Sequence, residues 1–288
     1  MPGVRIVTFL GPDGPRPGAL KGDDQVVDLS GLAPTVAALI EAGPGTWDAA
    51  RVLAADAASV PLPRLLPPLR PASLRDFLAF EDHAKGGARP RNEELNPAWY
   101  ESPVYYKGNH RSIVGPDAEV AWPSFTDKLD FELELACVIG ALAIDLDEPN
   151  AADAIFGYTV MNDWSARDVQ RAEMAMRLGP AKSKDFATSL GPCIVTADEF
   201  DPAQPHAMIA RVNGAVWCEA STAAMHWTFP RMIAHVSRGE SVWPGDIYGS
   251  GTPFGGCGLD LDRWLEPGDV VELEIDGIGV LRNRVVRD

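Results

Sequence analysis

The 288-residue chain has few basic residues and lacks any long hydrophobic run. Its 25 lysines and arginines stand against 41 aspartates and glutamates, which gives a net charge of −16. This balance argues against nucleic acid or an anionic membrane as a partner, because both require basic surface. No apolar run approaches the roughly 20 residues that span a bilayer. The N-terminus shows no signal-peptide cleavage pattern and is better interpreted as a first strand.

Cysteine is also scarce, and its spacing excludes the common cysteine motifs. The four cysteines are far apart, with no C-x-x-C pair, so neither a disulfide framework nor a zinc ribbon is indicated. Cys137 and Cys193 lie in apolar, strand-like runs, where a free thiol behaves as a small hydrophobe. The sequence therefore predicts a cytoplasmic protein with reduced cysteines.

A proline-rich stretch over residues 60–73 indicates a boundary between two parts of the chain. We therefore predict a small N-terminal α/β domain over residues 1–71 and a larger domain over residues 72–288. In the first domain we expect two strands followed by two helices, over residues 4–9, 25–28, 35–42 and 47–58.

Residues 72–288 are dominated by short apolar or alternating runs bounded by Gly, Pro, Asn or Asp, which predict strands. We expect helices near Ser165 and over residues 229–238, and a hairpin across Asp276-Gly277. The fold class is α+β and mainly β, with a mixed sheet that forms a roll or barrel rather than a doubly wound sheet. The expected strands cover residues 118–122, 131–139, 158–161, 193–196, 208–212, 270–275 and 279–282.

The segment LDFELEL, residues 129–135, carries the strongest chemical signal. On a strand, residues two apart share a face, so Glu132 and Glu134 lie side by side, roughly 7 Å apart. Positions 131, 133, 135, 137 and 139 form an apolar face on the other side. Two carboxylates this close repel unless a positive charge lies between them. A divalent cation would satisfy them, although a solvated edge strand is the simpler alternative.

A third carboxylate, Asp163, is predicted at the end of another strand, in GYTVMNDWSARDVQ. Ser165 is then well placed to cap the helix that follows. Asp163 alone could be an ordinary turn residue. Together with Glu132 and Glu134 it forms an oxygen set that suits Mg²⁺ or Mn²⁺, and no histidine or cysteine clusters with these residues, which disfavours zinc.

Four motifs together resemble the fumarylacetoacetate hydrolase superfamily. They are DFLAFEDH, LDFELELACVIG, GYTVMNDWSARDVQ, and AKSKDFATSLGP followed by GSGT at residues 249–252. The resemblance extends from about residue 72 to the C-terminus. It implies a metal-dependent enzyme that acts on a small anionic oxo acid, often in aromatic compound catabolism, and it implies a homodimer.

The resemblance also implies roles for individual residues. The metal ligands correspond to Glu132, Glu134 and Asp163, and Asp76 matches a further acidic ligand found in only some members. The catalytic histidine corresponds to His83, in a loop or short helix that closes over the substrate. Further matches are catalytic positions at Lys184 and Gln170 and substrate-binding positions at Arg167, Tyr106, Thr188 and Thr252.

The implied reaction is hydrolysis of a C–C bond in a β-diketo acid, with water activated by His83. Many related acylpyruvases have a glutamate three residues after this histidine, where this chain has Gly86. Glu81 or a distant acid such as Glu266 could replace it. Without an assured partner for His83, a 2-oxo acid decarboxylase, hydratase or tautomerase remains an alternative, as does a non-catalytic metal-binding relative.

Overall fold

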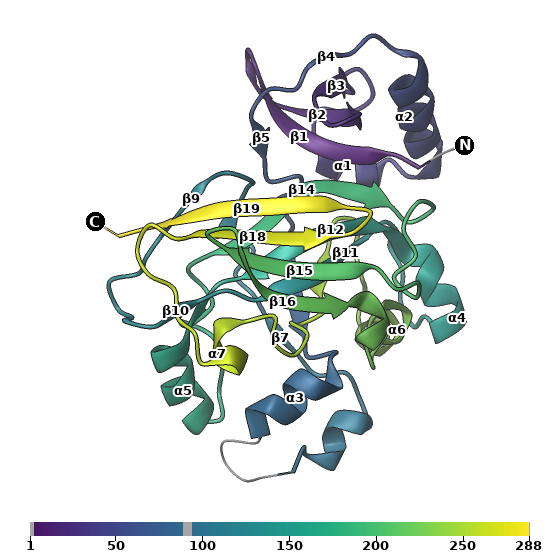
Figure 1. Cartoon of the computed structure of the whole chain (residues 1–288). Helices are drawn as coiled ribbons and strands as arrows, with labels where there is room; N and C mark the ends of the chain where they lie inside the picture. The colour runs from purple at the N-terminus through teal and green to yellow at the C-terminus, as the bar shows by residue number, and fades with distance from the viewer. Residues whose placement is uncertain (1–2, 89–93, 288) are drawn as a thin grey trace.

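The computed structural model describes residues 3–88 and 94–287. Its strands form a 12-stranded sheet, a five-stranded sheet and a small two-stranded pair. The prediction of a mainly β fold with a mixed sheet is confirmed. Neither large sheet closes into a barrel within the described residues (Figure 1). Of the predicted roll or barrel, the barrel is therefore not formed by the described strands.

The N-terminal elements form a layer at one end of the molecule, shown in purple and dark blue in Figure 1. The hydroxyl of Thr35 caps the first helix by accepting from the N–H of Ala38, which fixes where that helix begins. Strand β1 pairs with β14, so the N-terminal strands extend the large sheet. These elements are β1 (Arg5–Gly11), β2 (Gly14–Lys21), β3 (Gln25–Asp28), α1 (Val36–Glu41), α2 (Pro44–Asp56), β4 (Val60–Pro61) and β5 (Leu65–Leu66).

The large sheet runs in the order β4-β3-β2-β1-β14-β12-β11-β17-β6-β7, with β5 paired to β1 and β8 to β14. Most pairs are antiparallel, but β17–β6 and β14–β8 are parallel, which makes the sheet mixed. The remaining strands are β6 (Leu74–Phe77), β7 (Tyr105–Lys107), β8 (Ile113–Val114), β11 (Leu133–Ile139), β12 (Ile155–Asp163), β14 (Thr188–Thr196) and β17 (Ile247–Gly249).

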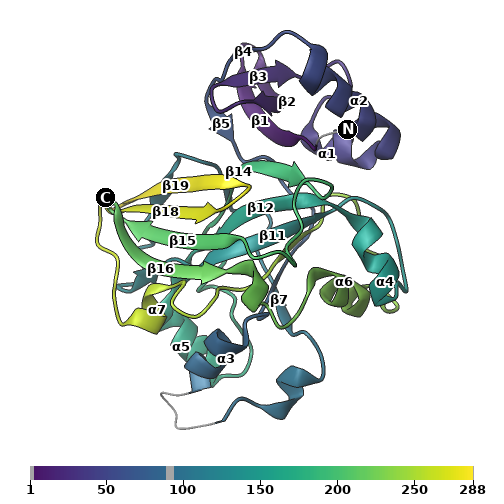
Figure 2. The same ribbon diagram turned by 45° about the vertical axis from the view of Figure 1, so that its right-hand side comes forward.

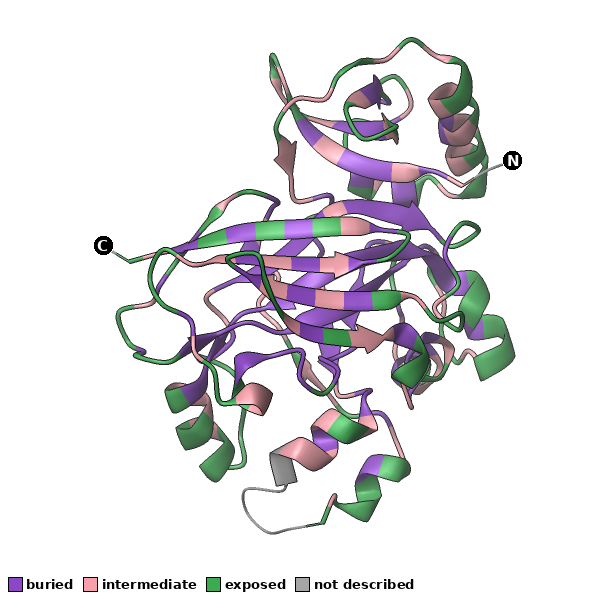
Figure 3. Ribbon diagram, viewed as in Figure 1, coloured by how far each residue is buried: buried purple, intermediate pink, exposed green. Residues whose placement is uncertain are grey.

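The five-stranded sheet packs over the central strands of the large sheet (Figure 2). The predicted hairpin at Asp276-Gly277 is present as the turn between β18 and β19. Buried and exposed residues alternate along these strands, as expected for a sheet with one solvated face (Figure 3). The sheet contains β9 (Glu119–Ala121), β15 (Ala207–Val212), β16 (Ala215–Ser221), β18 (Val270–Ile275) and β19 (Gly279–Val286).

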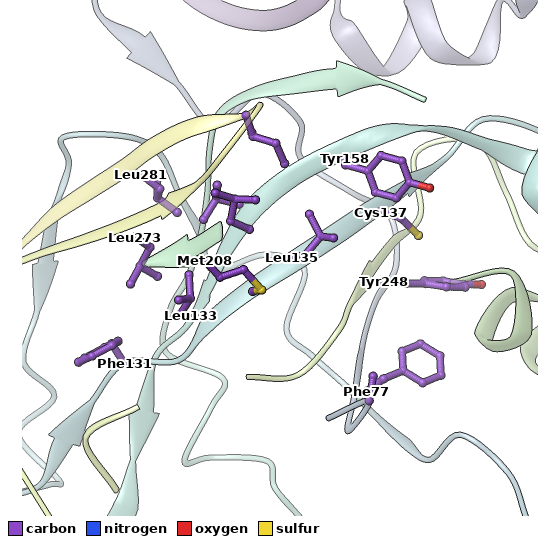
Figure 4. Close-up of a cluster of buried hydrophobic side chains, with 14 of the residues drawn as sticks. Phe77, Phe131, Leu133, Leu135, Cys137, Tyr158, Met208, Tyr248, Leu273 and Leu281 are labelled. Carbon is purple, nitrogen blue, oxygen red and sulfur yellow. The ribbon is translucent and has the colours of Figure 1, made fainter. Parts of the chain in front are cut away.

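The predicted apolar face of residues 131–139 lies in the main core. Phe131, Leu133, Leu135 and Cys137 are fully buried. Leu133 lies beside Met208 and Leu273 of the five-stranded sheet, and Cys137 lies beside Tyr158 and Tyr248 (Figure 4). Both faces of β11 are covered, and β11 lies between β12 and β17. The alternative of a solvated edge strand is therefore wrong, because the carboxylates of this segment are buried with it.

Three helices gather at the end of the molecule opposite the N-terminal layer: α3 (Glu81–Ala88), α5 (Arg167–Ala175) and α7 (Gly258–Leu261) (Figure 1). Helices α4 (Glu148–Ala151) and α6 (Phe229–Ser237) pack beside each other. The described residues contain no helix that is both long and apolar enough to cross a membrane.

The predicted helix cap at Ser165 is wrong. Ser165 and Ala166 form strand β13, which pairs with β10 (Leu129–Asp130), so the chain is still extended at Ser165. The Ser165 hydroxyl donates to the carbonyl of Asp163, and α5 begins one residue after Ala166 without a side-chain cap. Strand pairing therefore overrides the local capping preference of serine.

Candidate metal centre and active site

Four carboxylates meet where neighbouring strands of the large sheet line up. Glu134 lies in β11, Asp163 ends β12, Asp76 lies in β6, and Glu132 immediately precedes β11. Their ligand atoms all lie within 4.8 Å of one another, and all four residues are buried. The three predicted ligands thus come together, and Asp76, which the sequence supported less firmly, joins them.

The GSGT segment explains how the chain brings this much charge together. The N–H of Gly251 donates to both Glu134 Oε2 at 3.0 Å and Asp76 Oδ1 at 3.2 Å. A Cβ at Gly249 would lie 2.2 Å from Met161 Cε, 2.6 Å from Asp76 Oδ1 and 2.8 Å from Glu134 Oε2. Glycine is therefore required at 249 to leave room for the carboxylates, and the segment acts as a backbone-exposing loop rather than a phosphate-binding one.

Two buried cations lie on one side of the cluster. Lys184 Nζ contacts Glu132 Oε2 at 2.7 Å and Asp163 Oδ2 at 2.5 Å. Arg167 binds Glu132 Oε1 through Nη1 at 2.8 Å and Asp130 Oδ2 through Nε at 2.7 Å. Lys184 is therefore not an exposed surface ion pair, the alternative that its sequence alone allowed.

The cations divide the four carboxylates into two groups. Burial opposes ionisation of Glu132, but the charges of Lys184 and Arg167 outweigh it and lower its pKa to about 2. Burial raises the pKa of Glu134, and the charge of Asp76 raises it further. Burial also raises the pKa of Asp76, and the charge of Asp163 adds to this rise, whereas the hydrogen bond with Glu134 opposes it. Burial also raises the pKa of Asp163, which Lys184 partly opposes. Two cations are too few for this acidic cluster, so a further positive charge is favoured between Glu134, Asp76 and Asp163.

Two carboxylate oxygens show where that charge would be bound. Glu134 Oε1 and Asp163 Oδ1 are buried and accept no hydrogen bond from any described residue. An unpaired buried anionic oxygen is costly unless it coordinates a cation. The donor set is all oxygen, without histidine or sulfur, which suits a hard cation such as Mg²⁺ or Mn²⁺. The residues present therefore fit a divalent metal.

His83, in α3, has a carboxylate partner that the sequence did not identify. Its Nδ1 lies 2.8 Å from Asp260 Oδ2, and the same oxygen accepts from the N–H of Gly255 at 2.9 Å. Asp260 lies in α7, 177 positions away in sequence, and no motif marks it. Cys257 offers a ligand atom within 4.8 Å of those of His83 and Asp260, and its backbone forms a bridge with that of Glu132, which places the pair beside the metal cluster.

The two acids that the sequence offered to His83 have other contacts. Glu81 pairs with Lys85 at 2.6 Å and accepts from the Tyr100 hydroxyl. The backbone N–H of Glu266 donates to the carboxylate of Asp269, and Glu266 is exposed. A Cβ at Gly86 would lie 3.4 Å from Asp260 Oδ1. Asp260 therefore lies close to the position from which a glutamate at 86 would reach His83.

The other predicted site residues surround the cluster. Tyr106 donates its hydroxyl to Asp163 Oδ2 at 2.7 Å, and Thr188 pairs with Asp163 across β14 and β12. Gln170 Oε1 accepts from Arg167 Nη1 at 3.0 Å, so Gln170 contacts an arginine of the site rather than the carboxylates. Thr252 is buried, and its hydroxyl has no partner in the described part of the chain. The roles expected for these residues stay predictions.

The family model for the C-terminal domain of fumarylacetoacetate (FAA) hydrolase matches residues 73–286. The chain belongs to the fumarylacetoacetate hydrolase family. A human relative, oxaloacetate tautomerase FAHD2A, is 34% identical and the match covers 98% of this chain and 92% of that protein. The solved structure of fumarylacetoacetate hydrolase from Exiguobacterium antarcticum is 29% identical in sequence and superposes with a TM-score of 0.83. The superposition covers 99% of this chain and 100% of that one.

Fumarylacetoacetate hydrolase family members carry out more than one reaction. Another similar structure is 2-hydroxyhepta-2,4-diene-1,7-dioate isomerase from Mycobacterium marinum, with 28% identity, a TM-score of 0.75 and 99% of both chains covered. The chain is therefore an enzyme of a divalent-metal-dependent family that contains hydrolases, isomerases and tautomerases. Membership alone leaves the reaction to be inferred from the site.

Proposed function

We propose that this protein hydrolyses a C–C bond in a β-diketo acid of the acylpyruvate or fumarylacetoacetate type. The contact between His83 and Asp260 beside the carboxylate cluster carries this proposal. Hydrolysis needs an activated water, and the histidine lacked an acidic partner in sequence. Asp260 supplies that partner.

His83 acts as the general base. Asp260 accepts from Nδ1–H, which leaves Nε2 free to take a proton from water. The water oxygen then bonds to the substrate carbonyl, the C–C bond breaks, and the proton on His83 passes to the leaving carbon. The Asp260 side chain is only 5% exposed, so its charge stabilises the imidazolium with little screening.

Buried donors around the cluster bind and orient the substrate. Arg167 Nη2 and Thr252 Oγ1 are buried without partners among the described residues, so both can donate to substrate carboxylate or carbonyl oxygens. Glu132, Glu134, Asp163 and Asp76 would hold Mg²⁺ or Mn²⁺, which polarises a chelating dicarbonyl and stabilises the enolate. Lys184 keeps Glu132 and Asp163 in place through its two ion pairs.

Turnover of a panel of acylpyruvates, followed by loss of their ultraviolet absorbance, tests this proposal. We expect activity with Mg²⁺ or Mn²⁺, no activity in EDTA, and loss of at least about 100-fold in His83→Ala. Activity that persists in EDTA would contradict it.

Oxaloacetate tautomerisation is the second candidate, because the human relative that matches nearly the whole chain bears that name. This reaction also needs an enolate and a proton-transfer group, but it consumes no water. His83, oriented by Asp260 as in the hydrolytic mechanism, would move a proton between a carbon and an oxygen of oxaloacetate. Comparing kcat/KM for enol-oxaloacetate and for acylpyruvates separates the two. A preference for oxaloacetate by several orders of magnitude would favour the tautomerase.

A further inference from the structure

A second group of metal-ligating side chains lies beside the acidic cluster. His83, Cys257 and Asp260 each offer a ligand atom, and these atoms lie within 4.8 Å of one another. His83 belongs to α3, whereas Cys257 and Asp260 belong to the segment that enters and forms α7. None of the three belongs to the four-carboxylate set, although the backbone of Cys257 forms a bridge with that of Glu132.

The chemistry of this group differs from that of the acidic cluster. Imidazole, thiolate and one carboxylate are the ligands that Zn²⁺ prefers, whereas Mg²⁺ binds thiolate poorly. Ligand atoms of a tetrahedral zinc lie about 3.3–3.8 Å apart, given bonds of 2.0–2.3 Å. His83 Nδ1 and Asp260 Oδ2 are already 2.8 Å apart, and Cys257 is a free, fully buried cysteine. Small side-chain shifts would therefore complete three corners of a zinc site.

We propose that His83, Cys257 and Asp260 form an inhibitory site for a soft divalent cation such as Zn²⁺. Coordination forms metal bonds to a ring nitrogen, to sulfur and to a carboxylate oxygen, and the Cys257 thiol proton leaves to solvent. Nothing is oxidised or reduced. A water or hydroxide fills the fourth position.

Occupation of this site has two consequences. It takes the His83–Asp260 pair out of proton transfer, and it joins α3 to α7, two elements that pack against each other (Figure 1). The His83 side chain is 15% exposed, against 5% for Asp260, so His83 is the more solvent-accessible of the two. The loss of activity rests on the proposed function of His83, but binding of the metal does not.

Cobalt(II) provides a readout of binding that is independent of activity. A cobalt–thiolate bond gives a strong near-ultraviolet charge-transfer band, and the acidic cluster cannot give this band because all its ligands are oxygen. With the full-length protein saturated with Mg²⁺, we expect one further equivalent of Co²⁺ to produce the band. Zn²⁺ should abolish it by competition.

Cys218 is a matched control for Cys257. It is also a free, buried cysteine, and it lies in β16. A Cβ at Gly255, two residues before Cys257, would lie 3.8 Å from the Cys218 Sγ. We expect Cys257→Ala to lose the cobalt band and Cys218→Ala to keep it. Asp260→Asn, which retains the thiol, should weaken Co²⁺ binding at least about 10-fold and serves if Cys257→Ala does not fold.

Measurements of enzyme activity in the presence of Zn²⁺ then test inhibition. Under saturating Mg²⁺, micromolar Zn²⁺ should inhibit the wild type and the Cys218→Ala variant at least about 10-fold more strongly than Cys257→Ala. Absence of the cobalt band in the wild type, or its persistence in Cys257→Ala, would overturn the site. Equal zinc inhibition in both cysteine variants would show that zinc only displaces Mg²⁺ from the carboxylates, which would overturn the inhibitory role.

Discussion

Asp260 determines which nitrogen of His83 can accept a proton in the proposed mechanism. It does so from a fixed position, because its Oδ2 also accepts from the Gly255 N–H. Asp260 therefore acts through His83 as a positioning residue. Its contribution should appear in the rate of the chemical step rather than in substrate or metal binding.

Asp260→Asn should lower kcat about 100-fold while KM and Mg²⁺ affinity change little. An amide keeps the size of the side chain but removes the charge that stabilises the imidazolium. Steady-state kinetics and calorimetric Mg²⁺ titration measure the two effects. Asp262→Asn is the matched control, because Asp262 ends α7 in a left-handed conformation that asparagine also tolerates. An unchanged kcat in Asp260→Asn would remove the carboxylate from the mechanism.

The pKa values of the cluster predict how Mg²⁺ stabilisation depends on pH. Burial raises the pKa of Asp76 and Glu134 in the metal-free fold. A raised folded-state pKa contributes stability below the unfolded value, about 4, and this is lost as pH rises through the folded value. Mg²⁺ favours the ionised carboxylates, so it should raise Tm more at pH 8 than at pH 5.5. Scanning calorimetry checks this, and a Tm increase that is larger at the lower pH would contradict it.

At the scale of elements, strand register assembles the metal site. Asp76 pairs with Gly249 in β17 on one side and with Tyr106 in β7 on the other, while β11 and β12 bring in Glu134 and Asp163. The alternation in LDFELEL and the strand end at Asp163 predicted that these carboxylates would lie together, because strand periodicity is local information, although β11 begins at Leu133 and Glu132 lies just before it. Asp260 could not be predicted in this way, since only the tertiary packing of α7 against α3 brings it to His83.

Gly249→Ala should weaken Mg²⁺ binding about 10-fold or more, because the added methyl group would displace the carboxylates of Asp76 and Glu134. The fold should persist, since these two groups and the third close atom, Met161 Cε, are all side-chain ends. Isothermal titration with Mg²⁺ measures the loss, and circular dichroism checks the fold. Gly45→Ala is the control, because Gly45 lies in α2 with nothing within 4 Å of its added Cβ. Equal affinities in the two variants would contradict the steric role of Gly249.

At the scale of the whole molecule, the N-terminal layer shares a core with the rest of the chain. Ile6 and Leu39 belong to the same buried cluster as Val138, Ile194 and Ile247. The sequence predicted β1, β3 and the two helices of this layer, but it missed β2 and the short strands β4 and β5. It did not predict that β1 would pair with β14, because such pairing depends on residues nearly 190 positions apart.

A variant restricted to residues 72–288 should therefore fail to unfold cooperatively. Removing residues 1–71 leaves Ile194 and Val195 of β14 without their β1 partners and exposes the shared apolar cluster, which favours aggregation. Size-exclusion chromatography and thermal unfolding of the variant check this. A monodisperse variant with a sharp unfolding transition would show instead that the predicted boundary at residue 71 separates independent folding units.

Oxygen-isotope labelling tests the proposed chemistry most directly. When an acylpyruvate is turned over with Mg²⁺ in ¹⁸O-labelled water, hydrolysis places one solvent oxygen in the carboxylate of the released acyl fragment. We predict this single label in the wild type, together with pyruvate, and at least about 100-fold slower product formation in His83→Ala. Conversion of the substrate between its tautomers without cleavage and without label would contradict hydrolysis.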